Sequence, residues 1–125
     1  MVRNALWRRV ELVARDDLDG LVALEAAAAE SAVHPPETPM TRDRWETALD
    51  GYYDEHDEVL TDADARGPQL FTFEAAVDGV RRATQTLHDP AGHHDWVVEA
   101  VVDLAASDEV GEAVVLVDAM RRLGG

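Results

Sequence analysis

Histidine and aspartate gather in the segment from residue 88 to residue 96, which reads His-Asp-Pro-Ala-Gly-His-His-Asp-Trp. This segment holds three of the five histidines of the chain, together with two aspartates and a tryptophan. Imidazole nitrogens and carboxylate oxygens are ligands for zinc and similar divalent ions, and histidine also transfers protons near neutral pH. The segment is therefore a candidate for a metal site or for a general base.

A metal here would use His88 and His94, because a hairpin brings the ends of its two strands together. Adjacent side chains on a strand point to opposite faces, so only one of His93 and His94 can face a site shared with His88. Open sites with two protein ligands hold an ion weakly, because zinc usually takes three or four. We therefore expect no tightly bound metal and no cofactor. The alternative role of the segment is a plain turn formed by Asp89, Pro90 and Gly92, with the histidines solvated or bonded to turn amides.

A His/Asp pair is the second kind of chemistry that these residue types allow. His56 lies in a predicted helix, whereas Asp95 and Asp103 lie on a predicted strand. A carboxylate that orients the imidazole would let His56 act as a general base. The competing interpretation is that His56 is a partly buried residue on a helix face, hydrogen-bonded to a tyrosine.

Three further side chains are candidates for binding a ligand: Tyr52, Arg66 and Trp96. Arg66 can clamp an anion with two parallel hydrogen bonds, or it can tie down its own loop by pairing with Asp62 or Asp64. Tryptophan can stack on a ligand, but in a small domain it more often closes the core.

The spacing of apolar residues predicts three helices in the first half of the chain. Their ranges are about 2–15, 18–31 and 41–59. An acidic break at 16–19 and a loop with three prolines at 33–39 separate them, since proline removes an amide donor. The third helix carries Tyr52 and His56 on a face that forms core or pocket wall.

From residue 68 the apolar period changes to two, which is typical of strands. The four predicted strands span about 68–73, 80–88, 96–104 and 113–120. Short connectors rich in Asp and Gly, including 107–111, indicate antiparallel neighbours. Trp96 shares a strand face with Val98 and Val102, so we expect it to pack inward near Trp45 or Tyr52.

Three helices followed by a four-stranded antiparallel meander predict an α+β fold with the helices packed on a curved sheet. The chain has the length of a single domain, here 1–125, with helices at about 2–59 and the sheet at about 68–122. The segment Arg15–Leu21, which closes the first helix, resembles the start of cone-like domains similar to nuclear transport factor 2 and the polyketide-cyclase-like enzymes. That resemblance implies a cavity between the third helix and the sheet.

Composition narrows the classes of partner. The chain has 26 acidic residues against 11 basic ones, all of them arginine, and a formal net charge of -15. Because affinity for a phosphate backbone comes from Lys and Arg, we expect no strong direct nucleic-acid binding. The absence of cysteine excludes thiolate metal sites, and the absence of lysine excludes an ATP-binding P-loop. No apolar run reaches about 18 residues, so we expect a cytoplasmic protein with no membrane attachment.

A second resemblance covers more of the chain. Residues 2–12, 64–68 and 88–108, together with Trp45, Ala48, Leu49 and Tyr53, resemble the uncharacterised C-terminal region of actinobacterial superfamily II (DEAD/DEAH-box) RNA helicases. This resemblance implies a non-catalytic accessory or protein-interaction domain, whose partner is another protein or helicase motor domains in cis or in trans. The alternatives are a small cone-fold enzyme of the isomerase, cyclase or dehydratase type and a small-ligand-binding protein, each using a His/Asp pair. A homodimer formed through the sheet is a further alternative.

Overall fold

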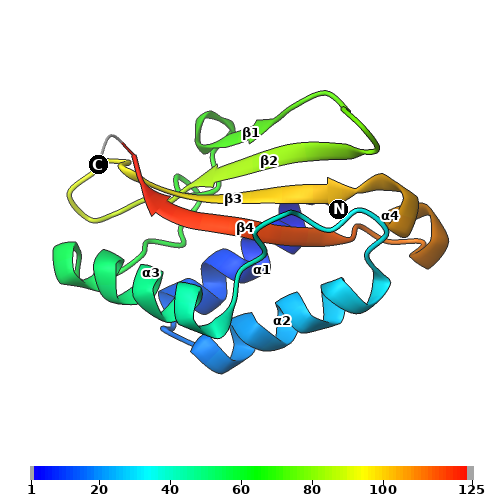
Figure 1. Cartoon of the computed structure of the whole chain (residues 1–125). Coiled ribbons are helices and arrows are strands. Elements are labelled where there is room, and N and C mark those ends of the chain that lie inside the picture. The colour runs from blue at the N-terminus through cyan, green and yellow to red at the C-terminus, as the bar shows by residue number, and fades with distance from the viewer. Residues whose placement is uncertain (1, 124–125) are drawn as a thin grey trace.

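The computed structural model describes residues 2–123, in which helices precede a sheet (Figure 1). The helices are α1 (Val2–Ala14), α2 (Leu18–Ser31), α3 (Arg42–Glu55) and the short α4 (Leu104–Val110), with a 3-10 turn at Pro68–Leu70. The strands are β1 (Phe71–Phe73), β2 (Val80–Thr86), β3 (Trp96–Asp103) and β4 (Val115–Arg122). The predicted α+β class is confirmed, whereas the cone-like shape stays a prediction.

The strands form one sheet in the order β1-β2-β3-β4, and every neighbouring pair is antiparallel, as the short connectors predict. Helices α1, α2 and α3 lie along one side of this sheet (Figure 1). The pairing of β3 with β4 shifts register between Glu99 and Ala100, so Asp118 on β4 has no opposite residue. No helix within residues 2–123 combines the length and the apolar character that crossing a membrane requires.

Side-chain caps begin two of the helices where the sequence places them. The carboxylate of Asp17 accepts a hydrogen bond of 2.8 Å from the amide of Gly20 at the start of α2. The hydroxyl of Thr41 accepts one of 3.2 Å from the amide of Arg44 at the start of α3. Each cap satisfies an amide that has no partner inside its helix, which is why these short polar residues mark helix starts.

The core lies between the helices and the sheet. Trp96 is only 7% exposed, and its ring lies 5.7 Å from that of Tyr52, so the predicted inward packing is confirmed. Alternate residues of β3, Val98 and Val102 among them, belong to the same buried cluster. Trp45 and Tyr52 on α3 are fully buried and belong to this cluster as well.

Helix α4 occupies residues that we expected to form a connector. The carboxylate of Asp103 accepts a hydrogen bond of 3.1 Å from the amide of Ala106 and caps its start. Gly111, with φ of +83°, ends it in the left-handed conformation that glycine adopts without strain. A helix of seven residues has fewer than two turns, so the spacing of its apolar residues predicts it only weakly. Its capping residues, Asp103 and Gly111, are the clearer sequence signal.

Four elements have boundaries that differ from the prediction by two residues or more. Strand β1 begins at Phe71 and not near residue 68, because Pro68–Leu70 form a 3-10 turn. Helix α3 ends at Glu55 and not near residue 59, because His56 is extended with φ of -131° and ψ of 144°. Strand β2 ends at Thr86, and His88 instead forms an isolated bridge with Leu60. Strand β4 begins and ends two residues later than expected. His56 and His88 therefore lie in connecting segments and not inside regular elements.

The outer edge of β4 is covered by a buried ion pair from α1 and α2. The guanidinium of Arg9 lies 3.1 Å from the carboxylate of Glu25 and donates a hydrogen bond of 2.8 Å to the carbonyl of Val115. The other carboxylate oxygen of Glu25 accepts a bond of 3.0 Å from the amide of Val117. An edge strand can pair with another chain through unpaired backbone groups, and these contacts occupy two of those groups on β4.

Candidate functional site

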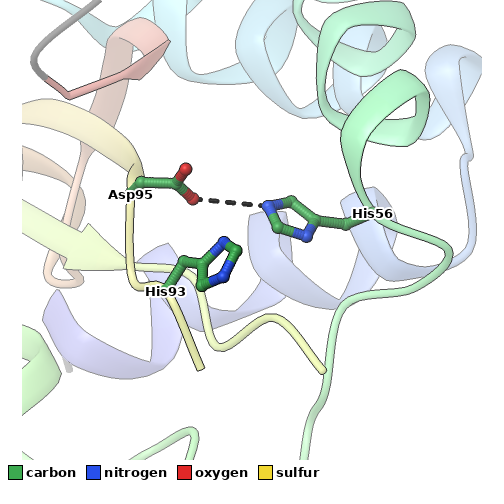
Figure 2. A group of neighbouring side chains, drawn as sticks. All are labelled: His56, His93 and Asp95. Atoms are coloured by element: carbon green, nitrogen blue, oxygen red, sulfur yellow. Dashed lines mark hydrogen bonds and ion pairs between the residues drawn. The ribbon is translucent and has the colours of Figure 1, made fainter. Parts of the chain in front are cut away.

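Two segments that are distant in the sequence meet at the C-terminal end of α3. His56 follows directly after α3, where its amide donates a hydrogen bond of 2.9 Å to the carbonyl of Tyr52. The turn between β2 and β3 brings His93 and Asp95 next to it (Figure 2). Ligand atoms of His56, His93 and Asp95 all lie within 4.8 Å of one another. The structure thus joins one predicted pair, His56 with Asp95, and adds His93.

Asp89 organises the turn from inside. Its carboxylate accepts hydrogen bonds from the amides of His93, at 3.0 Å, and His94, at 2.8 Å. Gly92 adopts φ of +73°, which lets the chain reverse without side-chain strain. Burial alone would raise the pKa of Asp89, but the two amides and nearby His56 outweigh it and hold the pKa below its ordinary value. This buried side chain is therefore a carboxylate at neutral pH.

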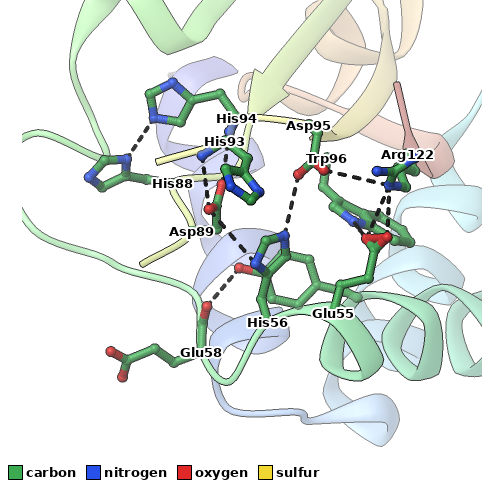
Figure 3. A network of polar contacts seen from close by, with 11 residues as sticks. Glu55, His56, Glu58, His88, Asp89, His93, His94, Asp95, Trp96 and Arg122 are labelled. Atoms are coloured by element: carbon green, nitrogen blue, oxygen red, sulfur yellow. Dashed lines mark hydrogen bonds and ion pairs between the residues drawn. The ribbon is translucent and has the colours of Figure 1, made fainter. Parts of the chain in front are cut away.

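The imidazole of His56 lies between two carboxylates (Figure 3). Its Nε2 is 3.3 Å from Oδ1 of Asp95, and its Nδ1 is 3.7 Å from Oδ2 of Asp89. The imidazole side chain is 6% exposed, and the side chains of Asp89 and Asp95 are 2% and 20% exposed. The aspartates fix the ring on both sides, as a positioned base or ligand requires.

A second layer of contacts holds Asp95 in place (Figure 3). The Nε of Arg122 lies 3.5 Å from Oδ2 of Asp95 and 2.8 Å from Oε1 of Glu55. Oε2 of Glu55 accepts a hydrogen bond of 2.7 Å from the indole of Trp96. Asp89 was predicted only as a turn residue, and no site role was predicted for Glu55 or Arg122. Nothing in the local pattern shows that the end of α3, the turn and the end of β4 converge.

The two adjacent histidines separate for a reason other than the one predicted. They lie on the turn and not on a strand, so strand alternation does not act on them. His94 adopts φ of +54°, and this left-handed residue sends the two rings in different directions. Nε2 of His94 lies 2.8 Å from Nδ1 of His88, whereas the ring of His93 stands 5.8 Å from that of His56. As expected, one of the pair meets His88.

Asp103 lies at the opposite end of β3 from Trp96, away from His56. The predicted alternative pairing of His56 with Asp103 is therefore wrong. Its carboxylate is fully buried and accepts hydrogen bonds from the amides of Val33 and His34 as well as Ala106. Burial would raise the pKa of Asp103, but these amides more than compensate and lower it. The residue anchors the loop after α2 to the start of α4.

Arg66 does not pair with the aspartates of its own loop, which corrects one predicted role. Its guanidinium donates a hydrogen bond of 2.9 Å to the side chain of Asn4 and lies 5.0 Å from the ring of Trp7. Asp62 instead accepts a hydrogen bond of 3.0 Å from the amide of Ala65. Arg66 therefore attaches this loop to α1 through a hydrogen bond and a cation–π contact.

Tyr52 is a core residue in this structure. Its hydroxyl donates a hydrogen bond of 2.7 Å to the carbonyl of Glu58, and its ring meets those of His56 and Trp96. Burial, with a smaller contribution from the charge of Asp89, raises the pKa of this hydroxyl. The predicted contact of His56 with a tyrosine is thus a ring contact, at 5.1 Å, and not a hydrogen bond to the hydroxyl.

A groove of about 480 Å³ adjoins the site, between α3 and the end of β4. Its floor is apolar, and three arginines, one aspartate and one threonine stand around it. The lining residues are Met40, Asp43, Arg44, Thr47, Ala48, Gly51, Trp96, Met120, Arg121 and Arg122. Trp96 and Arg122 belong both to the groove and to the contacts around Asp95. The arginine pair at 121 and 122 was the available sequence signal for it.

The chain belongs to the family described as Domain of unknown function (DUF3516), whose model matches residues 1–120. The matched range contains His56, His93 and Asp95, together with most of the groove. No curated protein and no solved structure matches the chain.

Proposed function

We propose that this chain is a non-catalytic accessory domain that binds protein, and that its partner is the motor domains of an RNA helicase, in cis or in trans. One observation carries the proposal: aromatic side chains fill the interior, while an apolar hollow lies open on the outside. The link to a helicase is supported by the resemblance of residues 2–12, 64–68 and 88–108 to the C-terminal region of such proteins.

The filled interior argues against a substrate pocket of the cone type. A ligand in such a fold lies between the long helix and the concave sheet, in a cavity lined by apolar side chains. Here Trp45 and Tyr52 on α3 are each fully buried in the core cluster, and the ring of Tyr52 meets Trp96 on β3. Binding there would require both rings to leave the core, which costs far more than a small ligand typically returns.

The groove suits a segment of protein that carries an apolar side chain next to a carboxylate. An apolar side chain fits the floor, which Ala48, Trp96 and Met120 provide. A carboxylate would meet the rim, where the side chains of Arg121 and Arg122 are 52% and 46% exposed. Arg121 and Arg122 already pair with Glu99, at 2.6 Å, and Glu55, at 2.8 Å, so a carboxylate of the partner would join these ion pairs. The net charge of -15 disfavours a long polyanion such as RNA.

Titration calorimetry with purified motor domains of an actinobacterial superfamily II helicase tests the proposal. Thr47 is exposed on α3 and lines the groove, so Thr47→Arg should block docking and leave the core intact. Thr61→Arg makes the same change at an exposed threonine outside this groove and is the matched control. We expect binding that Thr47→Arg weakens at least about tenfold, or about 1.4 kcal/mol, and that Thr61→Arg leaves unchanged.

Two results would count against this function. Motor domains that release no heat and do not co-elute at tens of micromolar protein would remove the helicase partner. Binding that survives Thr47→Arg unchanged would show that the partner uses another surface.

One contact favours the second candidate, a small-ligand-binding protein or cone-fold enzyme. Nε2 of His56 and Oδ1 of Asp95 lie 3.3 Å apart, close enough for the carboxylate to orient the ring. Nuclear magnetic resonance with a fragment library tests it. A small molecule that shifts the His56 ring signals in the wild type and not in Asp95→Asn would favour this function over the accessory one.

A further inference from the structure

We propose that His56, His93 and Asp95 form a binding site for one divalent transition-metal ion of the zinc type. Zinc takes imidazole nitrogens and carboxylate oxygens at about 2.0–2.2 Å, so two ligand atoms of a tetrahedral site lie roughly 3.4 Å apart. Nε2 of His56 and Oδ1 of Asp95 already stand 3.3 Å apart, and the three ligand atoms fall within 4.8 Å (Figure 2). A small rotation of the exposed His93 ring completes the set.

The two carboxylates beside His56 favour a cation at this place. Nε2 of the ring lies 3.3 Å from Oδ1 of Asp95, and Nδ1 lies 3.7 Å from Oδ2 of Asp89. A neutral imidazole has one N–H, so it can donate a hydrogen bond to only one of these carboxylates. When the N–H points to Asp89, Nε2 and Oδ1 of Asp95 can both bind a divalent ion.

His56 and Asp95 each also have the outer partner that metal ligands typically have. A ligating histidine usually donates its other ring N–H to a carboxylate, and a ligating carboxylate is itself held by a donor. Asp89 lies 3.7 Å from Nδ1 of His56, and Arg122 lies 3.5 Å from Oδ2 of Asp95, the oxygen that faces away from His56 (Figure 3). Neither the contact of Asp89 with His56 nor that of Arg122 with Asp95 could be predicted from the sequence, because the tertiary structure brings these residues together.

This set differs from the one that sequence analysis weighed. His88 and His94 bond to each other at 2.8 Å, so each uses one ring nitrogen on the other. His56, His93 and Asp95 supply three ligand atoms, the number found in zinc sites with an open fourth position. Because His93 is exposed, that open position faces the solvent side, where water or a partner's side chain would complete the coordination.

Metal-stripped protein without a His tag, titrated with Zn²⁺ by calorimetry and with Co²⁺ by visible absorption, tests the site. We expect one ion per chain. His93→Ala removes an exposed ligand without a core contact and should weaken Zn²⁺ binding at least about 100-fold, whereas Asp89→Asn should weaken it about 10- to 100-fold. His34→Ala removes an equally exposed histidine from another loop and should leave binding unchanged.

The melting temperature, Tm, supplies a second readout, because an ion that binds only the folded chain raises Tm with its concentration. We expect this rise in the wild type and in His34→Ala and not in His93→Ala. The rival state is a His56 ring held between the two carboxylates with no metal. Absence of a Co²⁺ band and of any Tm rise would support that rival and overturn the site. Weak binding of several ions that all three variants share would show only the general attraction of an acidic surface, and would overturn it equally. These outcomes do not depend on whether the groove binds a helicase.

Discussion

Substitution of Arg9 by methionine should destabilise this protein more than its position on the first helix suggests. Arg9 is 5% exposed and makes three contacts that methionine cannot make. Its guanidinium pairs with Glu25 at 3.1 Å and donates hydrogen bonds to the carbonyls of Val115, at 2.8 Å, and Ala5, at 2.9 Å. Methionine keeps most of the unbranched apolar chain, so the change removes charge and donors more than volume.

The size of the loss in stability depends on Glu25, which remains buried after Arg9 is replaced. Glu25 is 9% exposed and remains bound to the amide of Val117, so it cannot turn to solvent without breaking the edge of β4. Removing one partner of a buried ion pair typically costs about 3–5 kcal/mol, because the other charge is left uncompensated. Ordinary domains have about 5–15 kcal/mol of stability, so Arg9→Met should be folded but markedly weakened.

The loss should depend on pH in a definite direction. Burial raises the pKa of Glu25 above its ordinary value, and the charge of Arg9 opposes that rise. Without Arg9 the pKa of Glu25 in the folded chain rises further. Folding is then less favourable at every pH where Glu25 is ionised in the unfolded chain, and this penalty disappears below the ordinary pKa of 4.5. The difference in stability between wild type and Arg9→Met should therefore be largest at pH 7 and should shrink towards pH 4.

Urea unfolding followed by circular dichroism measures these differences, with the midpoint falling and the slope m unchanged. Arg9→Met combined with Glu25→Gln removes the stranded charge and should be more stable than Arg9→Met alone at pH 7. Arg8→Met, at the exposed neighbouring position, should change stability by less than about 0.5 kcal/mol. The reasoning fails if Arg9→Met costs under about 1 kcal/mol or if the double variant is no more stable than the single one.

Three other outcomes follow from the structure. Trp96→Ala should cost about 3–5 kcal/mol in thermal or urea unfolding, as buried aromatics do, and an unchanged midpoint would make Trp96 a contact residue of the groove. Asp103 has a lowered folded pKa, so its contribution is present above the ordinary value of 3.8 and is lost as pH falls through the folded value. The stability gap between wild type and Asp103→Asn, measured by urea unfolding at pH 7 and pH 3, should narrow at pH 3. Single-stranded RNA should bind only weakly and in a salt-sensitive way in filter assays near physiological salt, and sequence-selective submicromolar binding would contradict the charge argument.

Local chemistry in the sequence was sufficient for most of the fold. Apolar periods of 3.6 and 2 separate helices from strands, because a helix and a strand each bury one face. Asp17 and Thr41 mark helix starts through contacts with amides three residues away. The short connectors make each strand antiparallel to the next. The end of α3 at Glu55 could not be predicted from local chemistry, because the helical spacing of apolar residues continues to about residue 59. In the folded chain His56 is extended, and the helix stops before it.

The site depended on distances that only the tertiary structure sets. His56 and Asp95 are 39 residues apart, and the sequence offered Asp95 and Asp103 as equal partners. They are eight positions apart along an extended segment that rises about 3.3 Å per residue, so only one of them can reach the end of α3. His93 joined them because the carboxylate of Asp89 binds two consecutive amides and folds the segment into a turn. The sequence thus determined that histidine and aspartate are available for a site. The end of α3 and the turn after β2 determined which of these residues lie together, namely His56, His93 and Asp95.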